Sequence, residues 1–125
     1  MEATRNLALT EEEMHQLIPR MSIEQKVGQL VVVGFEGTRI NADIRSIIVR
    51  HCVGGITLFA RNIQSPRQVA KLTNDLQNLT KETEHRIPLF IAADQEGGWV
   101  ARLKTGATVF PGNMALGAAG SAELA

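Results

Sequence analysis

The stretch Pro88–Arg102, PLFIAADQEGGWVAR, places an apolar run directly before a group of polar and glycine residues. The apolar run favours a β-strand, and a strand with no polar side chain on either face is typical of a parallel sheet covered by helices. In such sheets ligands bind beyond the carboxyl ends of the strands. Asp94 and Glu96 follow the run, so we expect the strand to bring carboxylates to that edge.

The spacing of the polar residues in this stretch adds detail. Asp94 and Glu96 are two residues apart, so their side chains point to the same side if the extended backbone continues through Gln95. The two glycines that follow permit a sharp turn, and Arg102 supplies a guanidinium that can bind hydroxyl or carboxylate oxygens. An aspartate at a strand end also serves as a turn former or helix cap. On residue types alone, a ligand site and a capping role are equally open for Asp94.

Two further apolar runs precede this strand. QLVVVGF at Gln29–Phe35 and ITLFA at Ile56–Ala60 predict strands, the first of them buried on both faces. Apolar residues at helical spacing predict helices over residues 40–50 and 65–84. Strands that alternate with helices specify βαβ units and a parallel sheet with its helices outside.

The two ends of the chain predict shorter elements. Thr10 with Glu13, and Ser22 with Gln25, form capping-box patterns that begin two helices. The first helix should break at Pro19, and the second carries three apolar residues on one stripe: Ile23, Val27 and Leu30. Residues 103–125 contain no strong strand, and we expect one helical turn over 113–116 and the start of a helix at 121–124.

Composition is that of an ordinary globular domain. The chain has 125 residues, of which 44% are hydrophobic, and its 13 basic and 13 acidic residues cancel. Nothing therefore indicates nucleic acid or an anionic membrane as a partner. The single cysteine, Cys52, cannot form an internal disulfide and is interpreted as a small buried hydrophobe. No metal or cofactor is implied.

The start of the chain contains no apolar core of the kind found in secretory signals, and no run is long enough to span a bilayer. We therefore expect a cytoplasmic protein. Three strands are too few for a barrel, which takes about 250 residues, so we interpret the chain as the opening segment of something larger.

Five motifs, in order, resemble the N-terminal domain of glycoside hydrolase family 3. They are SIEQKVGQL (Ser22–Leu30), GGITLFARNI (Gly54–Ile63), SPRQVAKLTNDLQ (65–77), IAADQEGGWVAR (Ile91–Arg102) and FPGNMALGAAG (Phe110–Gly120). The nearest branch resembles the bacterial β-N-acetylglucosaminidases of cell-wall recycling. The ordered set is far more specific than any one motif.

The resemblance implies a (β/α)₈ TIM barrel, an α/β fold of which this chain supplies roughly the first three βα units. Residues 1–21 would form an N-terminal extension helix, and residues 22–125 would form the first barrel strands and helices. Enzymes of this branch remove terminal β-linked N-acetylhexosamine with retention of configuration. The implied partners are a carbohydrate substrate, with N-acetylglucosamine favoured, and the rest of the barrel.

The resemblance also assigns the site residues. Asp94 matches the family aspartate that binds hydroxyls of the sugar to be cleaved, and Arg102 matches the arginine that helps to hold that sugar. The family nucleophile lies on a later strand, and the acid/base histidine of this branch lies on a later loop after a KHFPGHG-like motif, which is absent here. We therefore expect no catalytic residue in this chain and no activity from it alone.

Other polar residues receive supporting roles. We interpret Glu96 as support for the site or for the turn, and not as half of a nucleophile and acid pair. Arg61 and Asn62 match the family but are interpreted as structural, with the arginine paired to nearby carboxylates. The three histidines are interpreted as solvent-facing or helix-terminal residues: His15, His51 and His85.

Trp99 departs from the family, which commonly has arginine after the two glycines. An indole there could stack against a sugar or pack under the loop, and we favour packing.

Two alternative functions stay open. The protein could be a β-glucosidase or β-xylosidase of the same family, or the chain could be a non-catalytic, truncated remnant.

Overall fold

A computed structural model describes residues 10–124 of the chain. The first nine residues of the predicted extension lie outside the described residues. Two short helices, α1 (Glu11–Leu17) and α2 (Ile23–Gln29), come first, with a 3₁₀ turn over Ile18–Arg20 between them. Three strands and two longer helices then alternate: β1 (Val32–Val33), α3 (Ala42–His51), β2 (Gly55–Leu58), α4 (Pro66–Leu79) and β3 (Phe90–Ala93).

The helices begin where local sequence predicts. The Thr10 hydroxyl accepts from the Glu13 N–H at 3.2 Å, and the Glu13 carboxylate accepts from the Thr10 N–H at 2.8 Å. Ser22 and Gln25 form the same reciprocal pair at the start of α2. Each pair satisfies backbone donors that have no partner within the helix. Both capping boxes are therefore confirmed, and the first α-helix ends at Leu17, just before the proline.

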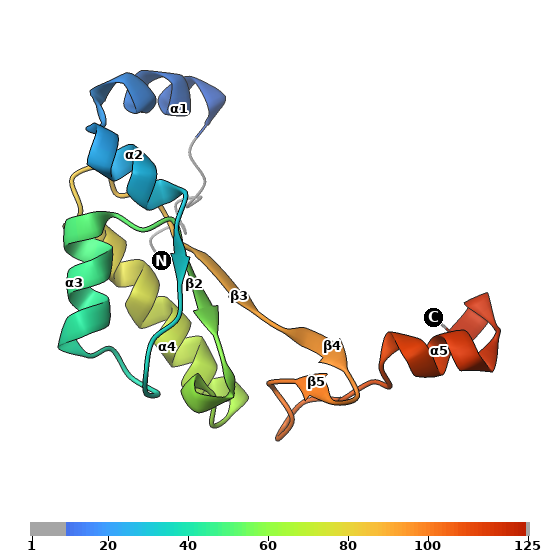
Figure 1. Ribbon diagram of the computed structural model, residues 1–125. Helices are drawn as coiled ribbons and strands as arrows, with labels where there is room; N and C mark the ends of the chain where they lie inside the picture. Colours follow the sequence, from blue (N-terminus) through green and yellow to red (C-terminus); the bar gives the residue numbers. More distant parts are fainter. Residues whose placement is uncertain (1–9, 125) are drawn as a thin grey trace, which may run out of the picture.

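The three strands form one parallel sheet in the order β1-β2-β3, as predicted. Figure 1 shows α3 and α4 together on one side of this sheet. Their apolar faces meet the sheet in a core whose most buried members come from both helices and from β2: Ile44, Ile48, Leu72, Leu76, Ile56 and Leu58. Burial of these side chains is the main force that holds the βα units together.

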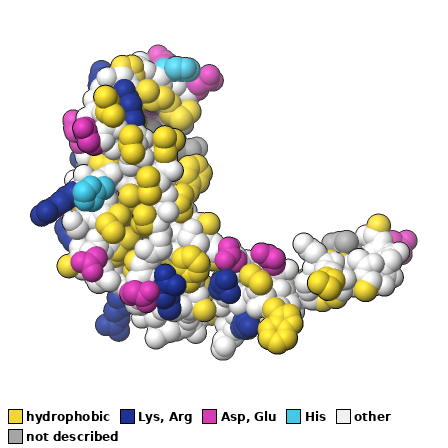
Figure 2. All heavy atoms as spheres, viewed as in Figure 1, with side chains coloured by type: hydrophobic (Ala, Val, Ile, Leu, Met, Phe, Trp, Pro, Cys, Tyr) yellow, Lys and Arg dark blue, Asp and Glu magenta, His cyan; other side chains and the backbone are white. Residues whose placement is uncertain are grey.

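The expectation that the strands are buried on both faces is wrong for β1 and β3. Val32 is exposed and the Phe90 side chain is 81% exposed, because α3 and α4 cover only one face of the sheet. In the space-filling view, hydrophobic side chains are visible over α1, α2 and the start of the sheet (Figure 2). The apolar stripe predicted on α2 is likewise exposed. One face of this unit is therefore packed and the other is bare.

The first predicted strand is also shorter than expected, because its beginning belongs to α2. Gln29 ends that helix, and its side-chain amide donates to the Cys52 carbonyl at 2.7 Å. Gly28 lies so close to the end of α3 that a Cβ atom there would be 2.0 Å from the His51 carbonyl oxygen. The Gly54 N–H donates to the Gly28 carbonyl at 2.9 Å. Glycine is required at this contact because two backbone segments touch directly.

The region after β3 differs most from expectation. Two short antiparallel strands, β4 (Gln95–Gly97) and β5 (Val100–Ala101), form a hairpin that sequence did not predict. The single helical turn predicted near residue 113 is a longer helix, α5 (Asn113–Ala119), and a 3₁₀ turn follows it at Ala122–Leu124. Within residues 10–124, no helix has the length and apolar character needed to cross a bilayer.

Candidate functional site

The parallel strands end at one edge of the sheet, and the candidate site lies there. Asp94 directly follows β3, and the loop after β2 contains a 3₁₀ turn, Ala60–Asn62. Parallel register aligns the ends of β2 and β3, with Leu58 beside Ala93. The topology therefore brings the segments after both strands to the same edge, where ligands of parallel sheets bind.

Asp94 and Arg102 lie together at this edge. An Arg102 terminal nitrogen is 3.1 Å from Asp94 Oδ2, and the two side chains are 25% and 47% exposed respectively. The second carboxylate oxygen of Asp94 accepts no hydrogen bond from residues 10–124. The Arg102 Nε is buried and has no hydrogen-bond partner in the same part of the chain. The pair thus combines an orienting ion pair with free hydrogen-bonding capacity.

The side chain of Gln95 holds the backbone of Arg102 in place, a role that the sequence analysis does not predict. Its Oε1 accepts from the N–H groups of Arg102 and Leu103, at 2.8 and 3.0 Å. Its Nε2 donates to the Leu103 carbonyl at 3.1 Å. The side chain therefore ties the start of β4 to the segment after β5. The signal for this role in the sequence is the position of Gln95 between Asp94 and Glu96.

The turn predicted at the glycine pair is confirmed, since Gly97 has φ +84° and Gly98 has φ +56°. The expected role of Glu96 is not found. The register of the hairpin shifts between Gln95 and Gly97, as in a β-bulge, which breaks the side-chain alternation at Glu96. Glu96 is exposed, and its side chain makes no hydrogen bond or ion pair with the described residues. It therefore supports neither Asp94 nor the turn in this structure.

Trp99 does not pack under the loop, so that interpretation is wrong. Its side chain is 97% exposed because the hairpin carries it beyond the described core. A groove of about 280 Å³ runs between the hairpin and the segment after β2, and both Trp99 and Arg102 line it. The groove thus adjoins the Asp94–Arg102 pair.

Arg61 and Asn62 have structural contacts, as predicted. The Asn62 side chain is fully buried, and it donates to the carbonyls of Phe35 and Gly37 at 3.0 and 2.7 Å while accepting from the Phe59 N–H. Arg61 is 2.8 Å from the Glu36 carboxylate and also donates to the Phe35 carbonyl. These bonds join the loops that follow β1 and β2, and so shape the edge of the sheet.

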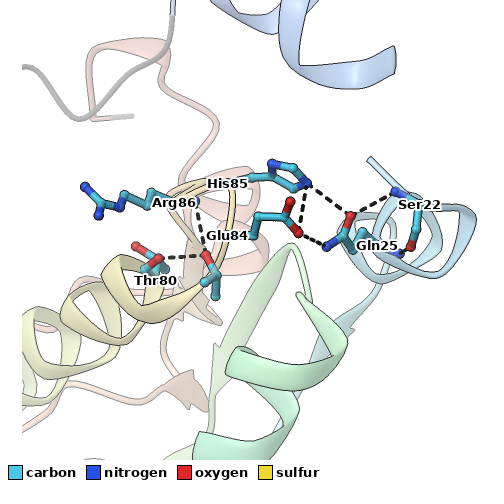
Figure 3. Close-up of polar contacts among 7 residues, drawn as sticks. Ser22, Gln25, Thr80, Glu84, His85 and Arg86 are labelled. Atoms are coloured by element: carbon cyan, nitrogen blue, oxygen red, sulfur yellow. Dashed lines mark hydrogen bonds and ion pairs between the residues drawn. The ribbon is translucent and has the colours of Figure 1, made fainter. Parts of the chain in front are cut away.

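The histidines do not gather at this edge. His15 and His51 are exposed, as expected. His85 differs, because its side chain is only 10% exposed and its Nε2 lies 3.1 Å from Gln25 Oε1. Figure 3 shows Glu84 and His85 beside Gln25 of α2, where the Gln25 amide also donates to the Glu84 carboxylate at 3.1 Å. His85 therefore helps to join α2 to the segment before β3.

Cys52 is half-buried rather than buried, and it ends α3 in the left-handed conformation with φ +51°. Burial raises the pKa of its thiol, and the negative charge of Glu84 raises it further. A raised pKa disfavours the reactive thiolate.

Across residues 10–124, no group of three or more His, Cys, Asp or Glu side chains is arranged to hold a metal ion.

Comparison with protein families gives one match over most of the chain. The model described as the glycosyl hydrolase family 3 N terminal domain matches residues 22–125. A beta-hexosaminidase A from Pseudoalteromonas piscicida is 45% identical over 82 residues, which cover 65% of this chain and 14% of that protein. A beta-hexosaminidase from Alkalilimnicola ehrlichii is 43% identical over 81 residues, which cover 65% of this chain and 22% of that protein. The chain thus spans a minor part of these relatives.

Solved structures give the same result. A glycoside hydrolase family 3 beta-N-acetylglucosaminidase from Paenibacillus sp. str. FPU-7 is 54% identical, with a TM-score of 0.78. The match covers 83% of this chain and 20% of that one. NagZ from Neisseria gonorrhoeae, in complex with N-trifluoroacetyl-D-glucosamine, is 30% identical with a TM-score of 0.64, over 76% of this chain and 26% of that one.

Proposed function

The chain belongs to glycosyl hydrolase family 3, as part of its N-terminal domain, and on this premise we propose that the whole protein is a glycoside hydrolase that removes terminal β-linked N-acetylhexosamine. N-acetylglucosamine is the favoured sugar, because relatives named beta-hexosaminidase and beta-N-acetylglucosaminidase match this chain. The observation that carries the proposal is the Asp94–Arg102 pair at the carboxyl edge of the sheet.

The pair suits the recognition of a sugar. A carboxylate accepts hydrogen bonds from two hydroxyl groups, and Arg102 already holds one Asp94 oxygen while the other is free among the described residues. Hydrogen bonds to charged groups are the stronger ones, and two of them fix the orientation of a ring as well as its affinity. In this proposal Asp94 and Arg102 bind the substrate and do not react with it.

The proposal extends to the fold of the whole protein, a (β/α)₈ barrel in which residues 22–125 provide roughly the first three βα units. Support comes from the parallel order of the strands and from their two outer edges, since β1 and β3 each pair only with β2 among the described residues. The exposed Phe90 is also explained, because the interior of such a barrel is filled with side chains.

Catalysis is assigned to residues outside this chain. Family resemblance places the nucleophile and the acid/base on later segments, and the reaction would proceed through a glycosyl-enzyme intermediate with retention of configuration. Binding without attack or proton transfer accelerates little. We therefore propose that residues 1–125 on their own do not hydrolyse glycosides.

The experiment that tests this function uses the full-length protein with p-nitrophenyl N-acetyl-β-glucosaminide and p-nitrophenyl β-glucoside. Asp94→Asn should reduce kcat/KM for the first substrate by about 10- to 100-fold, the loss expected when hydrogen bonds to a charged group are weakened. The matched control is Asp75→Asn, which removes a carboxylate paired with Lys71 on the surface of α4. That exposed pair contributes little.

Two results would overturn the proposal. A wild-type protein that hydrolyses the glucoside in preference to the N-acetylglucosaminide would assign it to a glucosidase branch. An Asp94→Asn variant as active as Asp75→Asn would remove Asp94 from the sugar site. The 125-residue chain, assayed beside the full-length protein, should show no turnover.

A further inference from the structure

We propose that Trp99 and the groove beside it bind the sugar unit attached to the one that is cleaved, so that Trp99 sets the preference for the leaving portion of the substrate. This inference rests on the proposed function and adds a second sugar position to it. It starts from two observations: an almost fully exposed indole, and a groove that the same indole shares with Arg102.

The exposure of Trp99 leaves its ring available to a ligand. An aromatic side chain of this size removes a large apolar area from water when it is covered, and the described residues leave it bare. The apolar C–H face of a pyranose ring is a flat partner of suitable size. A ring stacked there would still present its hydroxyl groups to polar neighbours.

The backbone that carries Trp99 is held in place before any ligand arrives. The Gly98 N–H donates to the Phe110 carbonyl at 2.9 Å. A Cβ atom at Gly97 would lie 2.5 Å from the same carbonyl oxygen, so the turn is pressed closely against the segment that follows it. The side chain of Gln95 fixes the other end of the hairpin. A backbone that is already fixed loses little conformational entropy on binding.

The groove supplies polar partners for a sugar. The residues that line it include Gln64, Ser65, Arg102 and Lys104 besides Trp99, whose side-chain types offer hydroxyl, amide and cationic donors. Its volume of about 280 Å³ is at the small end of ligand sites, which suits a single sugar unit.

The position of the groove makes it a continuation of the site. Arg102 contacts the Asp94 carboxylate with a terminal nitrogen and also lines the groove. In this proposal a disaccharide whose terminal sugar is held by Asp94 places its second ring in the groove. A substrate whose leaving group is a single atom cannot reach Trp99.

The test compares two substrates of the full-length protein, N,N′-diacetylchitobiose and N-acetyl-β-glucosaminyl fluoride. Trp99→Ala should lower kcat/KM for the disaccharide about five- to tenfold, mainly through KM, which is the size expected for one aromatic contact. The loss for the fluoride should be below twofold. Trp99→Phe should restore most of the disaccharide activity, because it keeps an aromatic face. The matched control is Met114→Ala, which removes another exposed apolar side chain, on α5.

Each outcome either supports or overturns the inference about Trp99. Equal losses on both substrates would give Trp99 a structural role, and no loss on either would mean that no sugar occupies the groove; both results overturn the inference and leave the proposed function intact. A wild-type protein that hydrolyses neither substrate overturns the proposed function, and this inference with it. A loss confined to the disaccharide and rescued by phenylalanine supports the second sugar position.

Discussion

The side chain of Gln95 holds the backbone of Arg102, because the Arg102 N–H donates to Gln95 Oε1 at 2.8 Å. The guanidinium of the same arginine binds Asp94. The amide of Gln95 therefore sets where the arginine leaves the hairpin, while Asp94 sets where its side chain ends. A side chain held from both ends loses little alignment through motion, which suits the sugar-binding role proposed for the pair.

Gln95→Ala should therefore reduce sugar binding although the side chain need not touch a ligand. It removes three hydrogen bonds, each worth about 1 kcal/mol, and we expect kcat/KM of the full-length protein to fall about tenfold. Gln95→Glu keeps the acceptor for both N–H groups and should lose less. If alanine and glutamate variants both match the wild type in kcat/KM, Gln95 does not position Arg102.

Gly28→Ala should destabilise the protein strongly. The added Cβ atom would meet the His51 carbonyl oxygen at 2.0 Å, where only movement of backbone can relieve the clash. We expect a loss of about 3 kcal/mol in the free energy of unfolding, seen as a lower Tm. Gly117→Ala is the matched control, because it lies within α5 with open space around it and should stabilise by about 0.5–1 kcal/mol. A similar Tm for the two variants would contradict the close approach of α2 and α3.

Gln25→Ala should loosen the attachment of α2. The side chain completes the capping box with Ser22 and also bonds to Glu84 and His85, so its removal leaves the nearly buried histidine without that partner. The expected cost is about 1–2 kcal/mol. Gln16→Ala, on the exposed surface of α1, serves as control. Hydrogen exchange should become faster in α2, and an unchanged exchange rate would argue against the contacts in Figure 3.

Cys52 should react slowly with iodoacetamide, because burial and the charge of Glu84 raise its pKa. Glu84→Gln should increase the alkylation rate at pH 8.5, whereas Glu123→Gln should not. Since folding raises this pKa, the folded state holds the thiol proton more tightly. The contribution to stability is complete below the ordinary value of 9.0 and is lost as pH rises through the raised value. Alkylation as fast as that of a free thiol would contradict both expectations.

Local signals predicted the parts of the fold that local chemistry decides. Thr10, Ser22 and Ser65 each accept from an N–H three residues later, and all three helix starts follow from the sequence alone. The parallel sheet also followed, because apolar runs separated by helical spacing leave few other arrangements. The site pair was predicted through family resemblance, and its geometry places Asp94 beside Arg102.

Contacts between distant segments account for what was missed. Burial on both faces of the sheet was inferred from the apolar run that contains Phe90, but burial depends on what covers the strand. The β4–β5 hairpin is held by the side chain of Gln95 and by contact between Gly97 and Phe110, and no periodicity reveals either. The contact of His85 with Gln25 is missed by the prediction of a solvent-facing or helix-terminal histidine, because Gln25 lies far away in sequence.

Because one face of the sheet is packed and the other is bare, neighbouring positions of the chain are under different evolutionary constraints. Leu89 is buried in the core, while Phe90, the next residue, faces away from it. Substitution at Leu89 is limited by the shape of α4 and its neighbours. Substitution of the Phe90 side chain is limited by whatever covers the bare face. In the proposed barrel, sequence drift at Phe90 should therefore track changes in the segments that complete the barrel, and drift at Leu89 should track changes in α4 and its neighbours.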